Sequence, residues 1–402
     1  MAYVGQTQTL NTTAFGDLAI SEVTGQIQVN FPVNLSPASV QVTVASSGTA
    51  TVSPPFAVLS TGTSATGSSA FQSVKRLHCK NGQGSLIFLS TIFSAGTSGS
   101  QQYIGLGDQM NGFFFGWNGS TFGILYRSSV YGASVSSVTT VDTWTYQSSW
   151  NQDTFDGAGS SGITLDPTMG NVYKIQMLCL GFGMVNFFIE DMSSGLFVPV
   201  HQLSFLNSYV NPFVSNPNLS ISANVQNSGN TSNLSLQVAS VSGFNEGSSY
   251  LDSIRYSASG TNNGFASNNL VLSIQNLYTF NGIINQKAVL PDFVSIWSSG
   301  NNSPVIYCFS LNPVLSTSSY LAVSTGTSVV QYYSPGSQAV TLSRQSSTRT
   351  LAHIQHGTSG QVNLSLSSLG IILNPGEVLA ISSFTISAFD NAFCSLSWTE
   401  EF

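Results

Sequence analysis

The segment from Gly112 to Tyr126, GFFFGWNGSTFGILY, decides the fold class. Two apolar runs flank Asn118-Gly119, and Asn-Gly supplies the positive φ angles that a tight hairpin turn requires. The segment therefore predicts a β-hairpin. Successive side chains of a strand point to opposite faces, so three consecutive Phe residues place rings on both faces. We expect another layer of this chain, or another chain, to cover at least one of them.

The same pattern continues along the rest of the chain. Apolar residues alternate or cluster in runs of four to eight, bounded by Gly, Asn, Ser and Pro, as in residues 26–31, 40–44 and 234–241. Short apolar runs that end at turn-forming residues are typical of strands. No stretch longer than a turn or two has a helical period. The sequence predicts an all-β protein with two antiparallel β-sandwich domains of jelly-roll or lectin-like type, plus an N-terminal arm.

Composition suggests where the domains divide. We expect residues 1–60 to be an N-terminal anchoring arm that carries strands, and residues 61–247 to be a large, lectin-like sandwich. Residues 248–269 consist mainly of Gly, Ser and Asn and are predicted to be a linker region. Residues 270–402 then supply enough strands for a smaller C-terminal sandwich.

Charge is scarce. Only 6% of the residues are charged, against about 25% in an ordinary domain, whereas 42% are hydrophobic. Neutral polar groups must therefore form the surface. The net charge of −7 excludes nucleic-acid binding as a main activity. No apolar run approaches the roughly 18 residues of a membrane-spanning helix. Long amphipathic helices need charged outer faces, so an α-rich enzyme is not expected.

The four cysteines, Cys79, Cys179, Cys308 and Cys394, are far apart and form no CxxC pair. We expect free thiols that pack as small hydrophobic residues, which fits folding in a reducing cytoplasm. The hydroxyl- and amide-rich composition instead suggests a protein that works outside a cell. A virion component satisfies both, because it is made in the host cytoplasm and leaves with the particle.

Three stretches together resemble a known family. The first is residues 77–125, with QYIGLGD at 102–108. The second is residues 153–201, with DTFDG at 153–157, GITLDPT at 162–168 and FVPVH at 197–201. The third is residues 269–285 together with the terminal LSWTEEF at 396–402. The set resembles β-rich proteins of tailed phages and large DNA viruses that look like virion surface components: fibres, spikes or tail-associated proteins. The resemblance extends from about Phe15 onward. It implies a place at the virion surface and transfers no catalytic motif.

The middle block is also similar to sandwiches of the laminin-G and legume-lectin type. The similarity lies in Tyr173-Lys-Ile, in the segment 186–191 and in the strand at 197–200. It concerns the fold alone and assigns no site.

One loop concentrates oxygen ligands that Ca²⁺ prefers. Asn151, Asp153 and Asp156 lie in this loop, and Asp166 follows nearby. These residues are candidate metal ligands, although Asp and Asn also cap turns through their own backbone. No other cofactor is expected.

Aromatic residues give the second candidate site. Trp144, Tyr146 and Trp150 follow a segment rich in Ser, Val and Thr and could form a platform on which a sugar stacks at a sandwich rim. Packing in the core is the alternative.

Other motifs are weaker. Residues 157–162 match G-x-G-x-x-G, but Pro167 and its neighbours exclude the helix that a dinucleotide site requires. Glu190 and Asp191 are adjacent and would point to opposite faces of a strand, so they cannot act as a catalytic pair. Asp153 and Asp156 could serve a hydrolase only if their loop brought them together. His353 and His356 would also face opposite ways on a strand.

These observations favour a non-enzymatic structural protein of a virion, an exposed spike, fibre or capsid- or tail-associated component. Low charge removes repulsion between identical subunits, so we expect a homo-oligomer, with a trimer as the usual state of such spikes. The arm would bind other virion proteins, and the exposed surface would attach to the host. A carbohydrate-binding adhesin that recognises a host surface glycan is the alternative, and a polysaccharide-degrading tail enzyme is a third.

Overall fold

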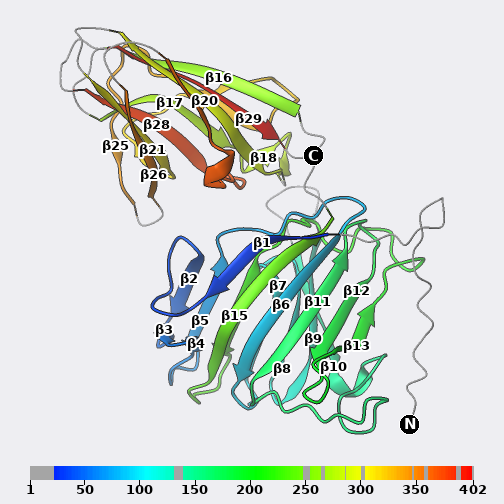
Figure 1. Ribbon diagram of the computed structural model, residues 1–402. Coiled ribbons are helices and arrows are strands. Elements are labelled where there is room, and N and C mark those ends of the chain that lie inside the picture. The colour runs from blue at the N-terminus through cyan, green and yellow to red at the C-terminus, as the bar shows by residue number, and fades with distance from the viewer. Residues whose placement is uncertain are drawn as a thin grey trace. The chain divides into compact units, whose positions relative to one another are not determined.

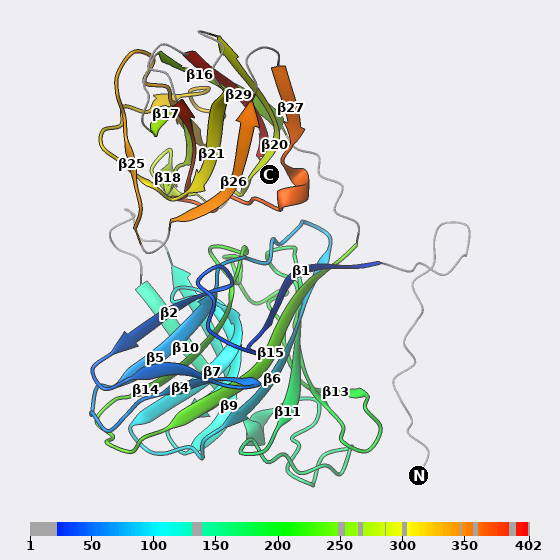
Figure 2. The same cartoon turned by 60° about the vertical axis from the view of Figure 1, so that its left-hand side comes forward.

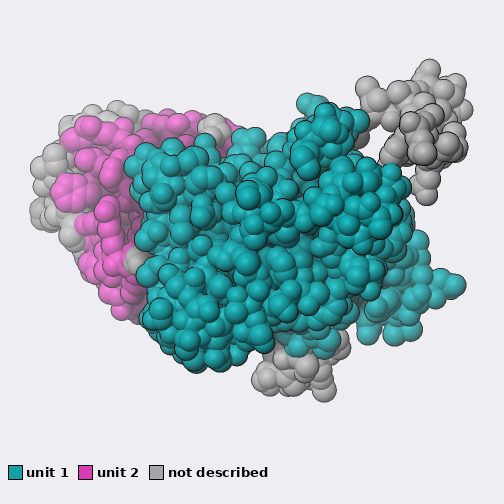
Figure 3. Space-filling view, turned by 90° about the horizontal axis from the view of Figure 1, so that it is seen from below, with its two compact units in different colours: residues 1–130, 139–249 teal, residues 131–138, 250–402 magenta. Residues whose placement is uncertain are grey.

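The computed structural model describes residues 22–130, 139–247, 254–263, 268–285, 287–299, 304–345, 348–356, 361–385 and 391–400. The chain divides into two compact units, which Figure 3 colours separately. Unit 1 comprises residues 1–130 and 139–249, and unit 2 comprises residues 131–138 and 250–402. The described residues form antiparallel strands and two short 3₁₀ turns, η2 (Gln147–Ser149) and η3 (Ser367–Leu369), which confirms the predicted all-β class.

Unit 1 consists of two antiparallel sheets (Figures 1 and 2). The eight-stranded sheet has the order β13-β12-β11-β6-β15-β4-β3, and β1 also pairs with β15. Its strands are β1 (Val23–Asn30), β3 (Thr49–Ser53), β4 (Phe56–Ser60), β6 (Gly84–Phe93), β11 (Asn171–Leu178), β12 (Val185–Glu190), β13 (Phe197–Leu203) and β15 (Ser235–Glu246). The seven-stranded sheet has the order β10-β9-β8-β7-β14-β5-β2. Its strands are β2 (Val40–Ala45), β5 (Ser68–Ser73), β7 (Ser100–Gly107), β8 (Gly112–Asn118), β9 (Thr121–Val130), β10 (Thr139–Tyr146) and β14 (Ile221–Asn227).

An aromatic core fills the space between these two sheets. Phe113 and Phe115 of β8 point into it, and Phe115 meets Tyr173 of the opposite sheet at a centroid distance of 4.8 Å. Phe114, between them, belongs to a separate apolar cluster on the other face of its sheet. The rings of the three Phe residues therefore occupy both faces, as the sequence predicts. Each fully buried ring contributes roughly 1.5–3 kcal/mol to folding.

The predicted hairpin is present, with its turn one residue further along. Asn118 is the last residue of β8 and pairs with Thr121, so Gly119 and Ser120 form the loop. Gly119 has a φ of 60°. A glycine with positive φ at the first loop position is characteristic of a type II′ turn. Like the type I′ turn, it matches the right-handed twist of the two flanking strands.

Unit 2 is a second, smaller sandwich. Its four-stranded sheet has the order β16-β29-β20-β27, and its six-stranded sheet has the order β23-β24-β17-β28-β21-β26. The first contains β16 (Ile254–Asn263), β20 (Val289–Ser299), β27 (Gln361–Ser365) and β29 (Asn391–Glu400). The second contains β17 (Asn269–Asn276), β21 (Val305–Leu311), β23 (Leu321–Ala322), β24 (Val330–Tyr333), β26 (Arg349–His356) and β28 (Val378–Thr385). Two ribbons complete it, β18 (Thr279–Phe280) with β19 (Ile283–Ile284), and β22 (Val314–Leu315) with β25 (Leu342–Ser343).

The described part of the predicted arm belongs to unit 1. Residues 23–60 form β1 to β4, which pair within its two sheets, and Ile27, Phe31 and Leu59 lie in the core. The remainder of the arm, residues 1–21, lies outside the described residues. The predicted linker also contains structure, because β16 pairs along its whole length with β29. The outward positions of β16 are polar, and small residues such as Ala258 and Gly260 lie between them at inward positions, so the sequence lacks the apolar alternation typical of a strand.

Two of the cysteines form a disulfide, so the expectation of four free thiols is wrong. Cys79 and Cys179 are bonded, although 100 residues separate them. Each lies close to one end of the paired strands β6 and β11, and this register brings the two ends of a long loop together. Cys308 and Cys394 are free.

None of the helical segments that the structure describes has the length and apolar character needed to cross a membrane.

Candidate functional site

The candidate site lies on the outer face of the seven-stranded sheet, the face turned away from the core. Strand register orders its side chains into rows that cross the strands. The first row runs Trp144, Leu125, Phe114, Gly105, Ser222, Gln72, Gln41, and the second runs Tyr146, Gly123, Gly116, Tyr103, Asn224, Ala70, Thr43.

A hollow of about 300 Å³, the sheet pocket, lies on this face. Strands β2, β5, β7, β9 and β14 and the loop after β7 line it with polar groups, among them Gln72, Asp108, Arg127 and Asn224, and with the ring of Tyr103. Such a combination of one aromatic ring with convergent polar groups is typical of small-molecule sites.

Aromatic residues extend the site toward β10. Tyr103, Phe114 and Leu125 form a small apolar cluster on the outer face, and Trp144 packs against it. Tyr146 lies in the same row as Tyr103 and is 37% exposed. Between these two tyrosines the row has only glycines. A Cβ on Gly116 would lie 2.0 Å from the Gln102 carbonyl oxygen, so no side chain fits there.

The predicted aromatic platform is therefore present in part. Trp144 and Tyr146 share the outer face, because they are two residues apart on β10. Trp150 is only 5% exposed and packs in the core against Phe115. The 3₁₀ turn η2 follows β10 and ends the alternation, and the Trp150 Nε1 donates to the Thr145 carbonyl oxygen at 3.3 Å. Trp150 is therefore a core residue and not part of the candidate site.

A line of hydrogen bonds, the amide relay, crosses the same face. Gln226 Nε2 donates to Gln101 Oε1 at 2.8 Å, and Gln101 Nε2 donates to Asn118 Oδ1 at 3.1 Å. Asn118 Nδ2 then donates to the Tyr146 hydroxyl oxygen at 3.1 Å. The relay fixes these side chains and connects Gln226, in the lining of the sheet pocket, with the exposed tyrosine. Asn224 adds a buried Nδ2 that donates to no residue the structure describes.

Arg127 brings a positive charge to the pocket, and Asp142 neutralises it. The Arg127 Nε and Nη2 lie 2.7 and 2.8 Å from the two Asp142 carboxylate oxygens. Its Nη1 donates to the Tyr103 hydroxyl at 3.1 Å. Burial alone would lower the pKa of Arg127, but the hydrogen bonds that it donates to Asp142 and Tyr103 outweigh burial and raise that pKa above its ordinary value. The guanidinium therefore stays charged and fixed.

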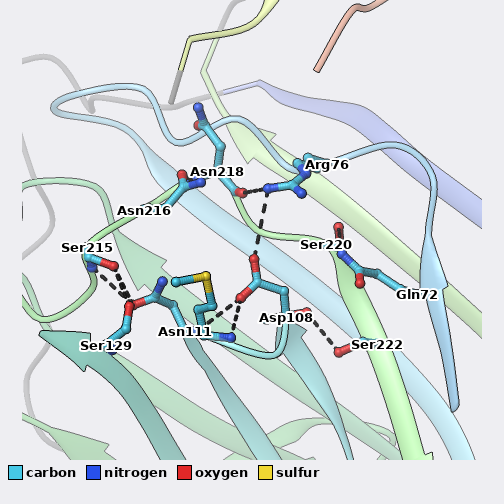
Figure 4. Close-up of polar contacts among 12 residues, drawn as sticks. Gln72, Arg76, Asp108, Asn111, Ser129, Ser215, Asn216, Asn218, Ser220 and Ser222 are labelled. Atoms are coloured by element: carbon cyan, nitrogen blue, oxygen red, sulfur yellow. Dashed lines mark hydrogen bonds and ion pairs between the residues drawn. The ribbon is translucent and has the colours of Figure 1, made fainter. Parts of the chain in front are cut away.

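The loop between β7 and β8 lines the sheet pocket with Asp108 and Gln109. Figure 4 shows the polar contacts of this loop. Asp108 Oδ1 accepts from the backbone N–H groups of Met110 and Asn111 at 2.8 and 2.9 Å, and Asp108 Oδ2 lies 3.9 Å from Arg76 Nη1. Asn111 Oδ1 in turn accepts from Ser129 and Ser215. These contacts hold the loop in place.

The four predicted metal ligands do not converge. The 2% exposed Asp153 accepts from the N–H groups of Phe155 and Ser161 and from the Ser160 hydroxyl. Asp156 accepts from the Thr154 hydroxyl and the Ala158 N–H, and Asp166 accepts from the hydroxyl and N–H of Thr168. These bonds lower the pKa of both carboxyls. Asn151 pairs with the backbone of Gln202.

Asp153, Asp156 and Asp166 therefore cap turns of their own loops, the alternative that the sequence leaves open, whereas Asn151 bonds to a residue 51 positions away. Within the part of the chain that the structure describes, no three His, Cys, Asp or Glu side chains gather as a metal site. For the same reason the loop does not present Asp153 and Asp156 as a facing pair.

Sequence reasoning missed most of the pocket. In the sequence, nothing distinguishes the amide side chains of Gln72, Gln101, Asn224 and Gln226 from other polar residues. Only the strand register shows that they share one face. One pattern in the sequence indicates the polar outer face of β14. In Ser222-x-Asn224-x-Gln226, polar side chains alternate with the buried Ala223 and Val225.

No protein-family model matches the sequence, and no curated protein matches it. Several solved structures are similar at low identity. A legume lectin-like domain from Entamoeba histolytica shares 12% identity with a TM-score of 0.31, covering 54% of this chain and 95% of that chain. A β-1,3-glucanase from Mycobacterium marinum shares 12% identity with a TM-score of 0.33, covering 54% and 97%. The CBM2 module of the evolved Dit of Lactobacillus casei BL23 phage J-1 shares 12% identity with a TM-score of 0.36, covering 58% and 100%.

Proposed function

We propose that unit 1 is a non-catalytic carbohydrate-binding module, whose ligand lies across the outer face of the seven-stranded sheet. One observation carries the proposal: the amide relay joins Gln226, which lines the sheet pocket, to the exposed Tyr146 on the same face. Aromatic rings and fixed amides are the two kinds of group that a sugar needs. The rings cover its C–H face, and amides both donate to and accept from its hydroxyls.

The charge of the pocket indicates which sugars fit. Arg127 is already bound at two points by Asp142, and Asp108 is held by backbone N–H groups and Arg76. No unpaired cation of the described residues lines the pocket to meet an acidic ligand. We infer an uncharged glycan. Its hydroxyls would exchange hydrogen bonds with Gln72, Asn224 and Gln226 without the cost of desolvating an ion.

The glycan would extend across the strands. Tyr103 and Tyr146 are three strand positions apart, about 14 Å at the usual spacing, with only Gly116 and Gly123 between them in their row. A ligand of several sugar units fits this separation better than one terminal sugar does.

The experiment is a binding titration of the full chain with uncharged oligosaccharides, chosen from a glycan array. Tyr146→Ala and Asn224→Ala should weaken the interaction. Tyr278→Ala and Asn363→Ala, exposed residues of unit 2, are matched controls that should leave it unchanged.

We further propose that this module serves host attachment at the surface of a virion, as part of a homotrimeric spike or fibre that binds other virion proteins. The low charge supports this role, because 25 charged side chains among 402 residues allow close packing of identical subunits. Light scattering on a sizing column tests it. A mass near three times 42.5 kDa supports the trimer, and a monomer contradicts it.

A further inference from the structure

Unit 2 contains a larger cavity, of about 580 Å³, on the outer face of its six-stranded sheet. On β21 the side chains of Val305, Tyr307 and Phe309 enter the core, so those of Ile306 and Cys308 face outward and form the cavity floor. We call this hollow the ribbon cavity, because the ribbon of β22 and β25 forms one of its walls.

The ribbon cavity exists because a segment folds over only part of the sheet face. Between β21 and β26 the chain crosses the outer face and buries Leu270 and Ala380 in a small second core, with Leu315 and Leu342 packed against it. Beyond this small core the face remains open. There the lining includes Leu342, Ser343 and Arg344 together with Thr350, His353 and Gln355 of the edge strand β26.

The charge of this cavity is opposite to that of the chain as a whole. Arg344 and His353 line it, and no Asp or Glu is among its lining residues. Arg344 is exposed, and its Nη2 donates to the Thr350 hydroxyl at 3.0 Å. No carboxylate of the described residues pairs with it. By contrast, Arg255 of the same unit lies 2.6 Å from Asp292. An unpaired guanidinium is therefore available at the mouth of a cavity in an acidic protein.

The rest of the lining suits a polyhydroxylated ring. Hydroxyls of Ser310, Thr348 and Thr350 and amides of Asn268 and Gln355 offer donors and acceptors. Ile306 and the 45% exposed Phe384 supply an apolar surface for C–H groups. The sheet pocket of unit 1 also combines amides with an aromatic ring, but its arginine is already paired.

We infer that the ribbon cavity binds a sugar that carries a carboxylate. Arg344 pairs with the carboxylate, for which the planar guanidinium offers two parallel N–H donors. The hydroxyl and amide groups bind the ring hydroxyls, and Phe384 covers one ring face. This site lies in a different unit from the neutral-glycan site and does not depend on it.

Cys308 provides a reporter inside the cavity. It is partly exposed, whereas Cys394 is buried and the other two cysteines are disulfide-bonded. Iodoacetamide should therefore alkylate the native chain at Cys308 alone, and Cys308→Ser should abolish the labelling. A ligand in the cavity should slow the reaction.

The experiment measures the rate of Cys308 alkylation in the full chain, with increasing D-glucuronate or N-acetylneuraminate. We expect saturable protection by at least one acidic sugar, and none by D-glucose or acetate at the same concentration. Arg344→Gln should raise the half-protecting concentration by roughly ten- to a hundredfold, the value of a charge-assisted hydrogen bond. The half-protecting concentration of Arg344→Lys should lie between those of the wild type and of Arg344→Gln. That of Arg255→Gln should equal the wild-type value.

Three results would overturn the inference. If neither acidic sugar protects Cys308, the cavity does not bind this class of sugar. Equal protection by acetate would show a site for any anion, and equal protection by glucose would show that the charge is not recognised. Because Arg344 is exposed, its variants should fold, and an unchanged labelling rate without sugar verifies this.

Discussion

Arg127 and Asp142 face each other across β9 and β10 and form a two-point ion pair on the outer face of the seven-stranded sheet. The Arg127 side chain is 11% exposed and that of Asp142 32%. Arg127 also lies over the ring of Tyr103, 5.1 Å from its centroid. The ion pair therefore holds Arg127 in place against the Tyr103 ring. It also neutralises the positive charge that Arg127 brings to the sheet pocket.

Removal of Asp142 should both destabilise unit 1 and change its ligand preference. Asp142→Asn leaves a largely buried guanidinium without its counter-charge, and we expect a loss of about 1–3 kcal/mol in the free energy of unfolding, measured in urea. The freed charge should also allow acidic oligosaccharides to bind. Asp292→Asn, at the more exposed pair with Arg255, should cost less than about 1 kcal/mol. Equal losses for the two variants would contradict this account.

Trp150 should matter for stability. Trp150→Ala empties a core site between Phe115 and Phe122, and we expect a loss of about 3–5 kcal/mol. Tyr146→Ala should change stability by less than about 1 kcal/mol, since Tyr146 lies exposed at the end of its strand. Thermal and urea unfolding of the two variants distinguishes their roles. A well-folded Trp150→Ala chain with weakened glycan binding would restore Trp150 to the site.

The disulfide should be an important support of unit 1. Cys79 and Cys179 close a loop of 100 residues, and loss of such a bond costs about 2–5 kcal/mol. We expect Cys79→Ser, or reduction of the wild type, to lower the urea midpoint of unit 1. Cys308→Ser leaves the disulfide intact and serves as the control. An unchanged midpoint after verified reduction would refute the prediction.

Two buried histidines should make the fold sensitive to acid. Burial lowers the pKa of His78 and of His201 from 6.5 to about 4. The unfolded chain therefore binds protons below pH 6.5 that the folded chain does not bind until about pH 4. Stability should be complete above pH 6.5 and fall as the pH drops toward 4, by up to about 1.4 kcal/mol per pH unit for each histidine.

Urea unfolding at a series of pH values measures this slope. His201→Gln should flatten it, while His353→Gln, at an exposed position, should not. A slope that both variants leave equal to that of the wild type would count against the assignment.

Much of the fold could be predicted from local pattern, because alternation and turn residues act over a few positions. The hairpin around Gly119 and the shared face of Trp144 and Tyr146 both follow from the two-residue period of a strand. Trp150 lies beyond a 3₁₀ turn, where that period no longer applies. In β16, Ser and Gly conceal the alternation, so a strand resembles a linker.

Other features depend on partners distant in the chain. The disulfide pairs Cys79 with Cys179 only because β6 and β11 are neighbours, and spacing alone gives no sign of this. The amide relay joins strands from residues 101 to 226, so its members become a site only in the assembled sheet. The loop that contains Asp153 and Asp156 differs from these features, because its contacts are local. Asp153 and Asp156 act locally, on backbone and hydroxyl groups of their own loop.

The most direct test of the central claim is a calorimetric titration of the full chain with an uncharged oligosaccharide identified on a glycan array. The account predicts saturable binding that Asn224→Ala and Tyr146→Ala each weaken at least about tenfold, with unchanged unfolding, while Asn363→Ala and Tyr278→Ala retain it. Failure of every uncharged glycan to bind, or binding that both outer-face variants leave intact, would contradict it.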